Sequence, residues 1–331
     1  MSVLFSMSGI VKHFPTSRGI VHAVDGVDLE IERDEVLGLV GESGCGKSSL
    51  ARLAVRIYEP DAGRIELDGV DITNLDQAGL RPHRPRVQMI FQDPFASLNP
   101  RATVGRILEE PLVVHRRGSP AERRERVQWL MDKVGLRPEA AGRYPHEFSG
   151  GQRQRIGIAR ALALSPDLII CDEPVSALDV SVRAQVINLL DRLRDEFAMS
   201  YLFISHDLSV VEHVADRIAV MYLGRIVEFA DRRSLWRGPL HPYTRALLAS
   251  VPPPVAGIPR KAVPMRLVEP PSPLAPPGGC RFHTRCPYAQ DVCRTLVPEL
   301  KTLPGTKRQV ACHLVESEDP DFPAPVLDPA F

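Results

Sequence analysis

The segment Gly41-Glu42-Ser43-Gly44-Cys45-Gly46-Lys47-Ser48 directly follows an apolar run at residues 36–40, Val-Leu-Gly-Leu-Val. Its spacing, two glycines flanking four residues and then Lys-Ser, is that of a phosphate-binding P-loop. Glycine permits the backbone angles and close approach by which such a loop turns several N–H groups toward one anion. We therefore predict a strand at 36–40, then the loop, then a helix from about Lys47 through Val55 whose positive end faces the same anion.

The two residues that end this motif have separate chemical roles. Lys47 would reach the β- and γ-phosphates of a bound nucleotide, and the hydroxyl of Ser48 would bind Mg²⁺. The alternative is a chance glycine-rich turn. A predicted strand before the loop and a predicted helix after it favour the phosphate site.

Composition excludes several classes of protein. The chain has 331 residues, 44% apolar and 25% charged, which suits one large or two modest globular domains. The formal net charge is zero, so bulk electrostatics give no case for nucleic-acid binding. Apolar runs fall short of a membrane span, and the N-terminus does not resemble a signal peptide. We expect a cytosolic protein that reaches the membrane only through a partner, with its six cysteines outside disulfides.

Proline marks the expected domain boundary. Ten of the 31 prolines lie between Pro252 and Pro277, a segment that regular helix or central strand would not tolerate. We interpret it as an extended linker, which divides the chain into residues 1–250 and 251–331. The acidic, proline-rich end, residues 316–331, is expected to be a poorly ordered tail.

The N-terminal region alternates apolar and polar positions. This pattern at residues 3–12 and 20–31 predicts half-buried antiparallel strands. Between them Phe14 precedes a turn-prone stretch at residues 15–17. An exposed aromatic ring here could stack on a nucleotide base, although an ordinary core phenylalanine would fit the same position.

A second buried strand is predicted to deliver two carboxylates. The continuous apolar run at residues 168–171 is typical of a parallel strand buried on both faces, and Asp172 and Glu173 follow it directly. Asp172 would lie in the Mg²⁺ shell. Glu173 would polarise the attacking water as general base, an effect typically worth about 10²–10⁴ in rate.

Two further strand ends carry polar side chains. The predicted strand at 87–91 ends at Gln92, which could bind Mg²⁺ and orient water. The predicted strand at 201–205 ends at His206, which could hydrogen-bond a γ-phosphate. Each residue alone is weak support for a site, because glutamine and histidine are common at solvated strand ends.

The region from 100 to 165 changes to helical patterning. Residues 119–122, Ser-Pro-Ala-Glu, form a capping box with proline at the first helical position, and apolar residues then recur at helical spacing. Residues 149–152, Ser-Gly-Gly-Gln, open another helix that runs to about Leu164 and leaves N–H groups at a positive helix end. This is a second potential phosphate site, one more than a single nucleotide needs.

In this order the segments resemble the nucleotide-binding subunit of an ABC transporter, over about residues 3–250. At position 148 phenylalanine replaces the leucine that is usual before the family signature. The matching positions are Phe14 for the adenine-stacking aromatic residue, residues 41–48 with Ser49 for Walker A, Gln92 for the Q-loop, residues 168–173 with Asp172 and Glu173 for Walker B and its catalytic glutamate, Ser149, Gly150, Gly151 and Gln152 for the signature, Ser176 to Asp179 for the D-loop, and His206 for the switch histidine.

The resemblance implies an architecture and a mode of action. The fold would be an α/β P-loop cassette with a RecA-like mixed sheet, an antiparallel β edge and a helical subdomain at about 93–165. Two ATPase subunits would pair head to tail, so that the signature of one meets the γ-phosphate bound to Walker A of the other. The expected partners are a second, identical or paralogous ATPase subunit, two transmembrane permease subunits and, indirectly, an extracytoplasmic substrate-binding protein. The chain would then lie on the cytoplasmic side of the membrane.

Two stretches narrow the resemblance further. Residues 91–101, from Phe91 to Arg101, resemble the extended Q-loop of oligopeptide and dipeptide importer ATPases, and residues 241–248 resemble the start of that group's C-terminal extension. Nickel importers share both features and remain an alternative. A soluble, non-transport ABC ATPase is a further alternative, but such proteins generally carry two cassettes or large insertions.

Four cysteines lie in the C-terminal region. Cys280, Cys286, Cys293 and Cys312 are separated by five, six and eighteen residues, so the paired C-x-x-C pattern usual for zinc is missing. So small a unit lacks a core of its own, and a metal would stabilise it. Resemblance to the peptide-importer ATPases suggests a [4Fe–4S] cluster on the four cysteines, with zinc or free thiols as alternatives. His283 and His313 could substitute as ligands, but we expect both to be bystanders.

Overall fold

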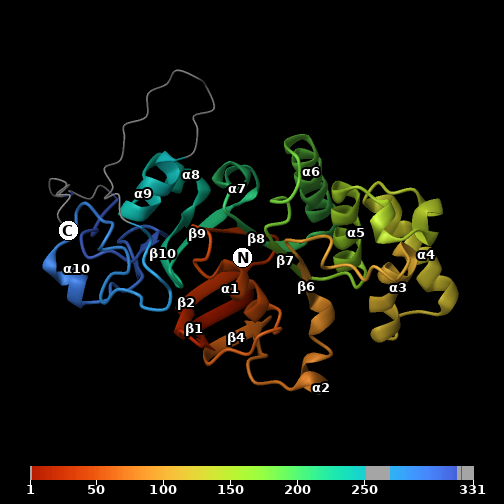
Figure 1. The fold of residues 1–331 in the computed structure, drawn as a ribbon, viewed down its shortest axis with the longest axis horizontal. Helices are drawn as coiled ribbons and strands as arrows, with labels where there is room; N and C mark the ends of the chain where they lie inside the picture. The colour runs from red at the N-terminus through yellow and green to blue at the C-terminus, as the bar shows by residue number, and fades with distance from the viewer. Residues whose placement is uncertain (1, 251–268, 319–321, 323–331) are drawn as a thin grey trace.

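The computed structural model describes residues 2–250, 269–318 and 322. The molecule is elongated: α8, α9 and α10 lie at one end, α3, α4 and α5 at the other, and the sheets lie between them (Figure 1). The strands are β1 (Val3–Thr16), β2 (Gly19–Glu32), β3 (Val36–Val40), β4 (Ala62–Leu67), β5 (Val70–Asp71), β6 (Val87–Ile90), β7 (Leu168–Asp172), β8 (Ser200–Ser205), β9 (Arg217–Tyr222), β10 (Arg225–Asp231), β11 (Lys301–Thr302) and β12 (Gln309–Val310). The α-helices are α1 (Lys47–Ala54), α2 (Gln77–Leu80), α3 (Val104–Val114), α4 (Pro120–Lys133), α5 (Gly150–Leu162), α6 (Val180–Phe197), α7 (Leu208–Val214), α8 (Arg232–Arg237), α9 (Pro242–Ala249) and α10 (Asp291–Thr295).

The main sheet has the order β11-β12-β10-β9-β3-β8-β7-β6. Its central strands β9, β3, β8, β7 and β6 are parallel, whereas β10, β12 and β11 continue one edge antiparallel. Every residue of β3, β7 and β8 is buried. For β7 this confirms the prediction from the apolar run at residues 168–171 that the strand is covered on both faces. The parallel strands bring the carboxyl ends of β3, β6, β7 and β8 to one edge, which is where the motif residues follow.

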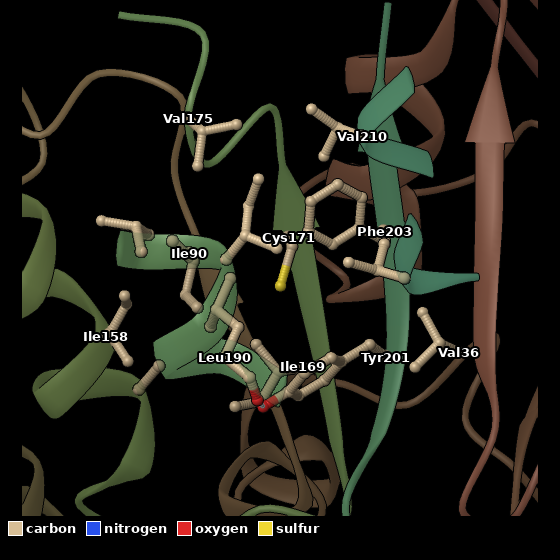
Figure 2. Packing of buried hydrophobic residues seen from close by; sticks show 14 of the residues in the cluster. Val36, Ile90, Ile158, Ile169, Cys171, Val175, Leu190, Tyr201, Phe203 and Val210 are labelled. Carbon is tan, nitrogen blue, oxygen red and sulfur yellow. Dashed lines mark hydrogen bonds between the residues drawn. The ribbon is translucent and has the colours of Figure 1, made fainter. Parts of the chain in front are cut away.

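The hydrophobic core on one face of this sheet links it to the helices. Figure 2 shows Ile169 and Cys171 of β7 beside Tyr201 of β8, facing Leu190 of α6. The hydroxyl of Tyr201 donates to the carbonyl of Leu190 at 3.0 Å, so the one polar group at this contact is satisfied. Burial raises the pKa of the Cys171 thiol, which therefore stays protonated and packs as a small apolar side chain, as expected from its sequence position.

A second, antiparallel sheet has the order β2-β1-β4-β5. The two strands predicted near the N-terminus are present as β1 and β2, and β1 continues through the residues expected to form a turn, as far as Thr16. Apolar residues of this sheet, such as Phe5 and Val27, pack with Leu50 of α1 and Leu39 of β3 in one cluster. The antiparallel sheet thus packs against the P-loop helix.

The helical region consists of α3, α4 and α5. Ser119 and Glu122 form the predicted capping box, in which the Ser119 N–H donates to Glu122 Oε2 at 2.6 Å. The predicted apolar stripe of α4, including Leu130 and Met131, is buried in the cluster that also contains Ile169 of β7. None of the described helices combines the length and apolarity needed to cross a bilayer.

The C-terminal extension is built onto the core sheet. Strand β12 pairs with β10 and carries β11 with it. Glu228 of β10 is completely buried and receives a hydrogen bond from Arg308 at 3.1 Å. Phe282 belongs to the main hydrophobic cluster, so the extension shares the cassette's core. The predicted domain boundary and part of the predicted tail lie outside the described residues, and both stay predictions.

Candidate nucleotide site

The P-loop connects β3 to α1, as predicted. Lys47 Nζ donates to the carbonyl oxygens of Gly41 at 2.8 Å and Glu42 at 2.9 Å, across the mouth of the loop. Gly46 has a φ of 109°, and a Cβ there would lie 2.0 Å from the carbonyl oxygen of Ala23. Only glycine fits this position, because both the backbone angle and the neighbouring backbone exclude a side chain.

The proposed magnesium ligands meet beside the loop. Ser48 Oγ donates to Asp172 Oδ1 at 2.9 Å, which joins the start of α1 to the end of β7. Asp172 is 1% exposed. Burial raises the pKa of its carboxyl, and the hydrogen bond from Ser48 offsets only part of that effect. A buried carboxylate with a neighbouring hydroxyl is an oxygen donor set that suits Mg²⁺, and a bound cation would compensate the buried charge.

Three strand ends converge on Glu173. Gln92 Nε2, after β6, donates to Glu173 Oε2 at 2.9 Å, and His206 Nδ1, after β8, lies 3.1 Å from Glu173 Oε1. Glu173 itself has a φ of 47°, an uncommon angle for a non-glycine residue that turns the chain sharply at the end of β7. Its side chain is 12% exposed, whereas that of His206 is 54% exposed. The structure therefore brings together the three residues that the sequence suggested separately.

The signature residues begin α5, as expected, but their N–H groups are partly occupied. Ser149 caps the helix by accepting from the Gln152 N–H at 3.3 Å, and Gln152 Oε1 accepts from the Ser149 N–H at 2.9 Å. A Cβ on Gly151 would lie 2.4 Å from Cγ1 of Val182 in α6, so close helix packing requires glycine there. These hydrogen bonds stay within one helix turn, and the segment is a separate element from the P-loop of the same chain.

The remaining predicted positions are more dispersed. Phe14 is half-buried on β1 with its ring edge against Tyr58 at a centroid distance of 5.2 Å. Asp179 is exposed and lies directly before α6. Within the loop, burial raises the pKa of Cys45 despite the nearby Lys47. Ser43, Gly44 and Ser49 complete the segment without side-chain contacts that decide its role, and their part in nucleotide binding stays a prediction.

Two family profiles match separate parts of the chain. The profile described as ABC transporter matches residues 24–176, which contain the P-loop, the Asp172–Glu173 pair and the signature. The chain is also 52% identical over 325 residues to the oligopeptide transport ATP-binding protein AppF of Bacillus subtilis strain 168, with 94% of this chain and 97% of the relative covered. The chain belongs to the ABC transporter ATP-binding proteins.

Further comparisons agree with this ABC ATPase assignment. A profile described as the oligopeptide/dipeptide transporter C-terminal region matches residues 227–293. The di/tripeptide transport ATP-binding protein DppF of Pseudomonas aeruginosa strain UCBPP-PA14 is 49% identical over 322 residues, covering 96% of this chain and 99% of the relative. A dimeric ATP-binding cassette, MJ0796 bound to ADP and phosphate, has a TM-score of 0.64 at 29% identity, over 70% of this chain and 99% of that one. The predicted α/β P-loop cassette fold is thereby confirmed.

The four C-terminal cysteines of this ABC ATPase lie within electrostatic reach of one another. Burial raises the pKa of Cys280 to about 11 and those of Cys286 and Cys312 to about 12, and the charges of neighbouring cysteines, Cys293 among them, add to each shift. The Cys280 N–H donates to the Cys293 carbonyl at 2.8 Å. None of the six cysteines, all of which lie in the described ranges, forms a disulfide.

The spacing of these four thiols is wider than a single zinc ion requires. Tetrahedral zinc with Zn–S bonds of about 2.3 Å holds its sulfurs about 3.8 Å apart. A metal site needs several donor atoms close together. Among the described residues, the side chains of His13, His22 and Asp25 place three donor atoms within 4.8 Å of one another. The described cysteines form no group of three within that distance. Thiolate sulfur is a donor that suits iron or zinc.

The histidine group has its own explanation. His22 Nδ1 lies 3.1 Å from His13 Nε2, and His13 Nε2 lies 3.4 Å from Asp25 Oδ1. Two guanidinium groups, those of Arg225 and Arg281, also contact the Asp25 carboxylate. These cations already neutralise the carboxylate and would repel a metal ion, so we interpret the group as a structural charge cluster.

Sequence reasoning missed two residues that touch the P-loop. The Glu42 N–H donates to Tyr243 Oη at 2.8 Å, and the Glu42 carboxylate is bound by Arg285 at 2.8 and 3.0 Å. Both lie more than 200 positions along the chain from Glu42. The sequence places Tyr243 within the 241–248 segment and Arg285 between Cys280 and Cys286. Neither position indicates that the residue contacts Glu42.

Proposed function

We propose that this ABC ATPase hydrolyses ATP to drive the import of dipeptides or oligopeptides through a partner permease. The observation that carries the ATPase part is the convergence of Gln92 and His206 on Glu173, beside the P-loop. The substrate class rests on near full-length similarity to proteins named for oligopeptide and di/tripeptide transport. The match to a family profile at residues 227–293 supports the same class.

Each residue of the site then has a defined part in hydrolysis. The P-loop N–H groups and Lys47 would bind the phosphates. Ser48, Asp172 and Gln92 would hold Mg²⁺, which when bound neutralises phosphate charge. Glu173 would accept a hydrogen bond from the attacking water and polarise it, and its position is fixed by Gln92 on one oxygen. His206, which is 54% exposed next to Glu173, would hydrogen-bond the γ-phosphate.

We infer that the site is completed by a second subunit. The helix end at Ser149, Gly150, Gly151 and Gln152 bonds within its own turn and would offer its remaining dipole and N–H groups to a phosphate on another cassette. Asp179 is exposed and free to approach the partner subunit. The similar cassette MJ0796 is described as dimeric in its nucleotide-bound structure, which supports this arrangement.

The permease would dock in a groove between the core and the helical region. A cavity of about 710 Å³ lies there, with Gln92 in its wall. Ile57 and Val114 also line it and are 50% and 54% exposed, so the groove offers apolar surface to a partner. A short apolar helix of a membrane subunit would bury them. A movement of Gln92 on nucleotide binding would then change the surface that contacts the permease.

We propose that the four C-terminal cysteines hold a [4Fe–4S] cluster. The proposal is supported by the position of these four thiols, which lie close enough for their charges to add to the burial that raises the pKa of Cys280, Cys286 and Cys312. Metal binding would deprotonate thiols whose pKa values are raised by burial, which makes loading strongly dependent on pH. His283 and His313 bond to the carbonyls of Cys280 and Leu296, in keeping with bystander roles.

The metal proposal is tested on protein purified without oxygen, by visible absorbance with iron, sulfide and zinc analysis. About four irons per chain with a broad charge-transfer band would support the cluster, and replacement of Cys286 by Ser should remove it. Stoichiometric zinc without colour would replace the cluster by a structural zinc site. No metal under anaerobic loading would leave four free thiols and reject both metals.

The transport proposal is tested by uptake in cells from which the gene has been deleted and restored. We expect uptake of labelled di- and oligopeptides to return with the wild-type gene and to stay absent with Glu173→Gln. Labelled Ni²⁺ uptake is measured in the same cells. Restoration of nickel but not peptide uptake would favour the nickel importer, and restoration of neither would point to a non-transport ATPase.

A further inference from the structure

Glu42 of the P-loop is held from three sides. Its N–H donates to the hydroxyl of Tyr243 at 2.8 Å, and its carbonyl accepts from Lys47 Nζ at 2.9 Å. Its carboxylate receives two parallel hydrogen bonds from Arg285, at 2.8 Å on Oε2 and 3.0 Å on Oε1. This two-pronged geometry is the strongest form of an arginine–carboxylate contact and fixes orientation as well as charge.

Arg285 comes from the C-terminal extension, between Cys280 and Cys286. Its side chain is 7% exposed, whereas that of Glu42 is 33% exposed, so the cation is the buried partner. Phe282, three residues earlier, packs its ring at 5.5 Å from Tyr243, which itself contacts Glu42. The segment that holds two of the four cysteines therefore touches the P-loop both through charge and through an aromatic contact.

A second contact ties the same segment to the loop. Arg281 donates to the carbonyl of Leu223 and to Asp25. Gly224, next to Leu223, donates its N–H to the carbonyl of Cys45 at 2.8 Å. The β9–β10 turn therefore contacts both the extension and the P-loop, which gives the extension a second, indirect contact with the loop.

We propose that Arg285 is a positioning residue of the nucleotide site and acts through Glu42. A carboxylate on the loop that receives a triphosphate would repel the ligand unless its charge were neutralised. Arg285 neutralises it and also orients the peptide that carries the Glu42 carbonyl, one of the two acceptors of Lys47. This inference rests on the nucleotide site proposed above, for which wild-type binding and its loss in Lys47→Ala serve as separate checks.

The experiment measures the affinity for a fluorescent ATP analogue and the steady-state KM and kcat for ATP in the full-length protein. Arg285→Gln is expected to raise both Kd and KM about five- to tenfold, with kcat within about twofold of wild type. Arg285→Lys keeps the positive charge but cannot make both parallel hydrogen bonds, so we expect a smaller rise in Kd and KM, about threefold. It also serves if the glutamine variant does not fold.

The double variant separates positioning from general damage. In Glu42→Gln/Arg285→Gln the unpaired carboxylate is gone, so we expect ATP affinity to recover most of the loss seen in Arg285→Gln. The matched control is Arg308→Gln, which removes another buried arginine of the same extension, one that pairs with Glu228 of β10 and not with a P-loop residue. That control should lower the melting temperature and leave KM for ATP unchanged.

The inference is overturned if Arg285→Gln leaves Kd and KM within twofold of wild type while Lys47→Ala loses binding. It is also overturned if the double variant stays as weak as Arg285→Gln, since the defect would then not act through the carboxylate. If wild-type protein itself fails to bind ATP, the nucleotide-site proposal fails instead.

Discussion

Ser48 Oγ donates to Asp172 Oδ1 at 2.9 Å although 124 positions separate the two residues. This contact joins the P-loop helix to the end of β7 and forms the oxygen pair that would hold Mg²⁺. Asp172 is buried, and burial raises the pKa of its carboxyl because it disfavours the charged carboxylate. A bound cation would stabilise that carboxylate.

Replacing Asp172 by asparagine should therefore remove the response to magnesium. We expect Mg²⁺-dependent ATP hydrolysis to fall by about a hundredfold or more, while ATP binding in excess chelator stays close to wild type. Titrations of nucleotide with and without Mg²⁺ provide the measurement. The control is Asp167→Asn, directly before β7, where the side chain pairs with Arg86. If the Asp172→Asn enzyme still tightens its hold on ATP when Mg²⁺ is added, the assignment is contradicted.

Folding stability should depend on pH through His241. Burial lowers the pKa of His241 to about 3, against about 6.5 in an unfolded chain. Below pH 6.5 the unfolded state takes up a proton that the folded state does not, so stability is lost as the pH falls, by up to about 1.4 kcal/mol per pH unit. Above pH 6.5 this contribution is fully present.

The variant His241→Asn tests that dependence. Asparagine can still cap α9, where His241 Nδ1 accepts from the Tyr243 N–H, but it does not titrate. Urea unfolding at pH 7.5 and 5.5 should show wild type losing about 1.4 kcal/mol more than the variant between the two pH values. The exposed His146, changed to asparagine, is the control and should keep the wild-type slope. Equal slopes for wild type and His241→Asn would rule the explanation out.

Val114→Asp should uncouple transport from hydrolysis. Val114 is 54% exposed at the end of α3 and lines the groove proposed for the permease. A charge there would disfavour an apolar partner, so peptide uptake should fall at least about tenfold, whereas the ATPase rate of the isolated protein and its stability should change little. Val70→Asp, at a 44% exposed position on β5, is the matched control. Normal uptake by the Val114→Asp variant would place the docking surface elsewhere.

Sequence alone was sufficient for the residues that local patterns define. The P-loop, the strand before Asp172 and the capping box at Ser119 depend on short-range spacing and burial, and each is present in the structure. The meeting of Gln92 and His206 at Glu173 could be expected once their strands were taken as parallel neighbours. Their roles in catalysis stay predictions.

Contacts made by the C-terminal extension could not be predicted. The pairing of β12 with β10, and of Arg285 with Glu42, depends on how a chain returns after more than 50 residues, and no local periodicity encodes such a return. The cysteine spacing suggested a metal but gave no indication that the same segment contacts the P-loop. Long-range charge pairs of this kind become visible only in three dimensions.

The most direct test of the ATPase assignment is steady-state hydrolysis by purified Glu173→Gln, compared with its binding of ATP. Glutamine keeps the size of the side chain but lacks the carboxylate that would polarise water. We predict undetectable turnover, unchanged ATP affinity, and accumulation of a closed ATP-bound dimer with its ATPase partner subunit in light scattering. Hydrolysis at the wild-type rate would show that Glu173 is not the general base and would contradict the account of the site.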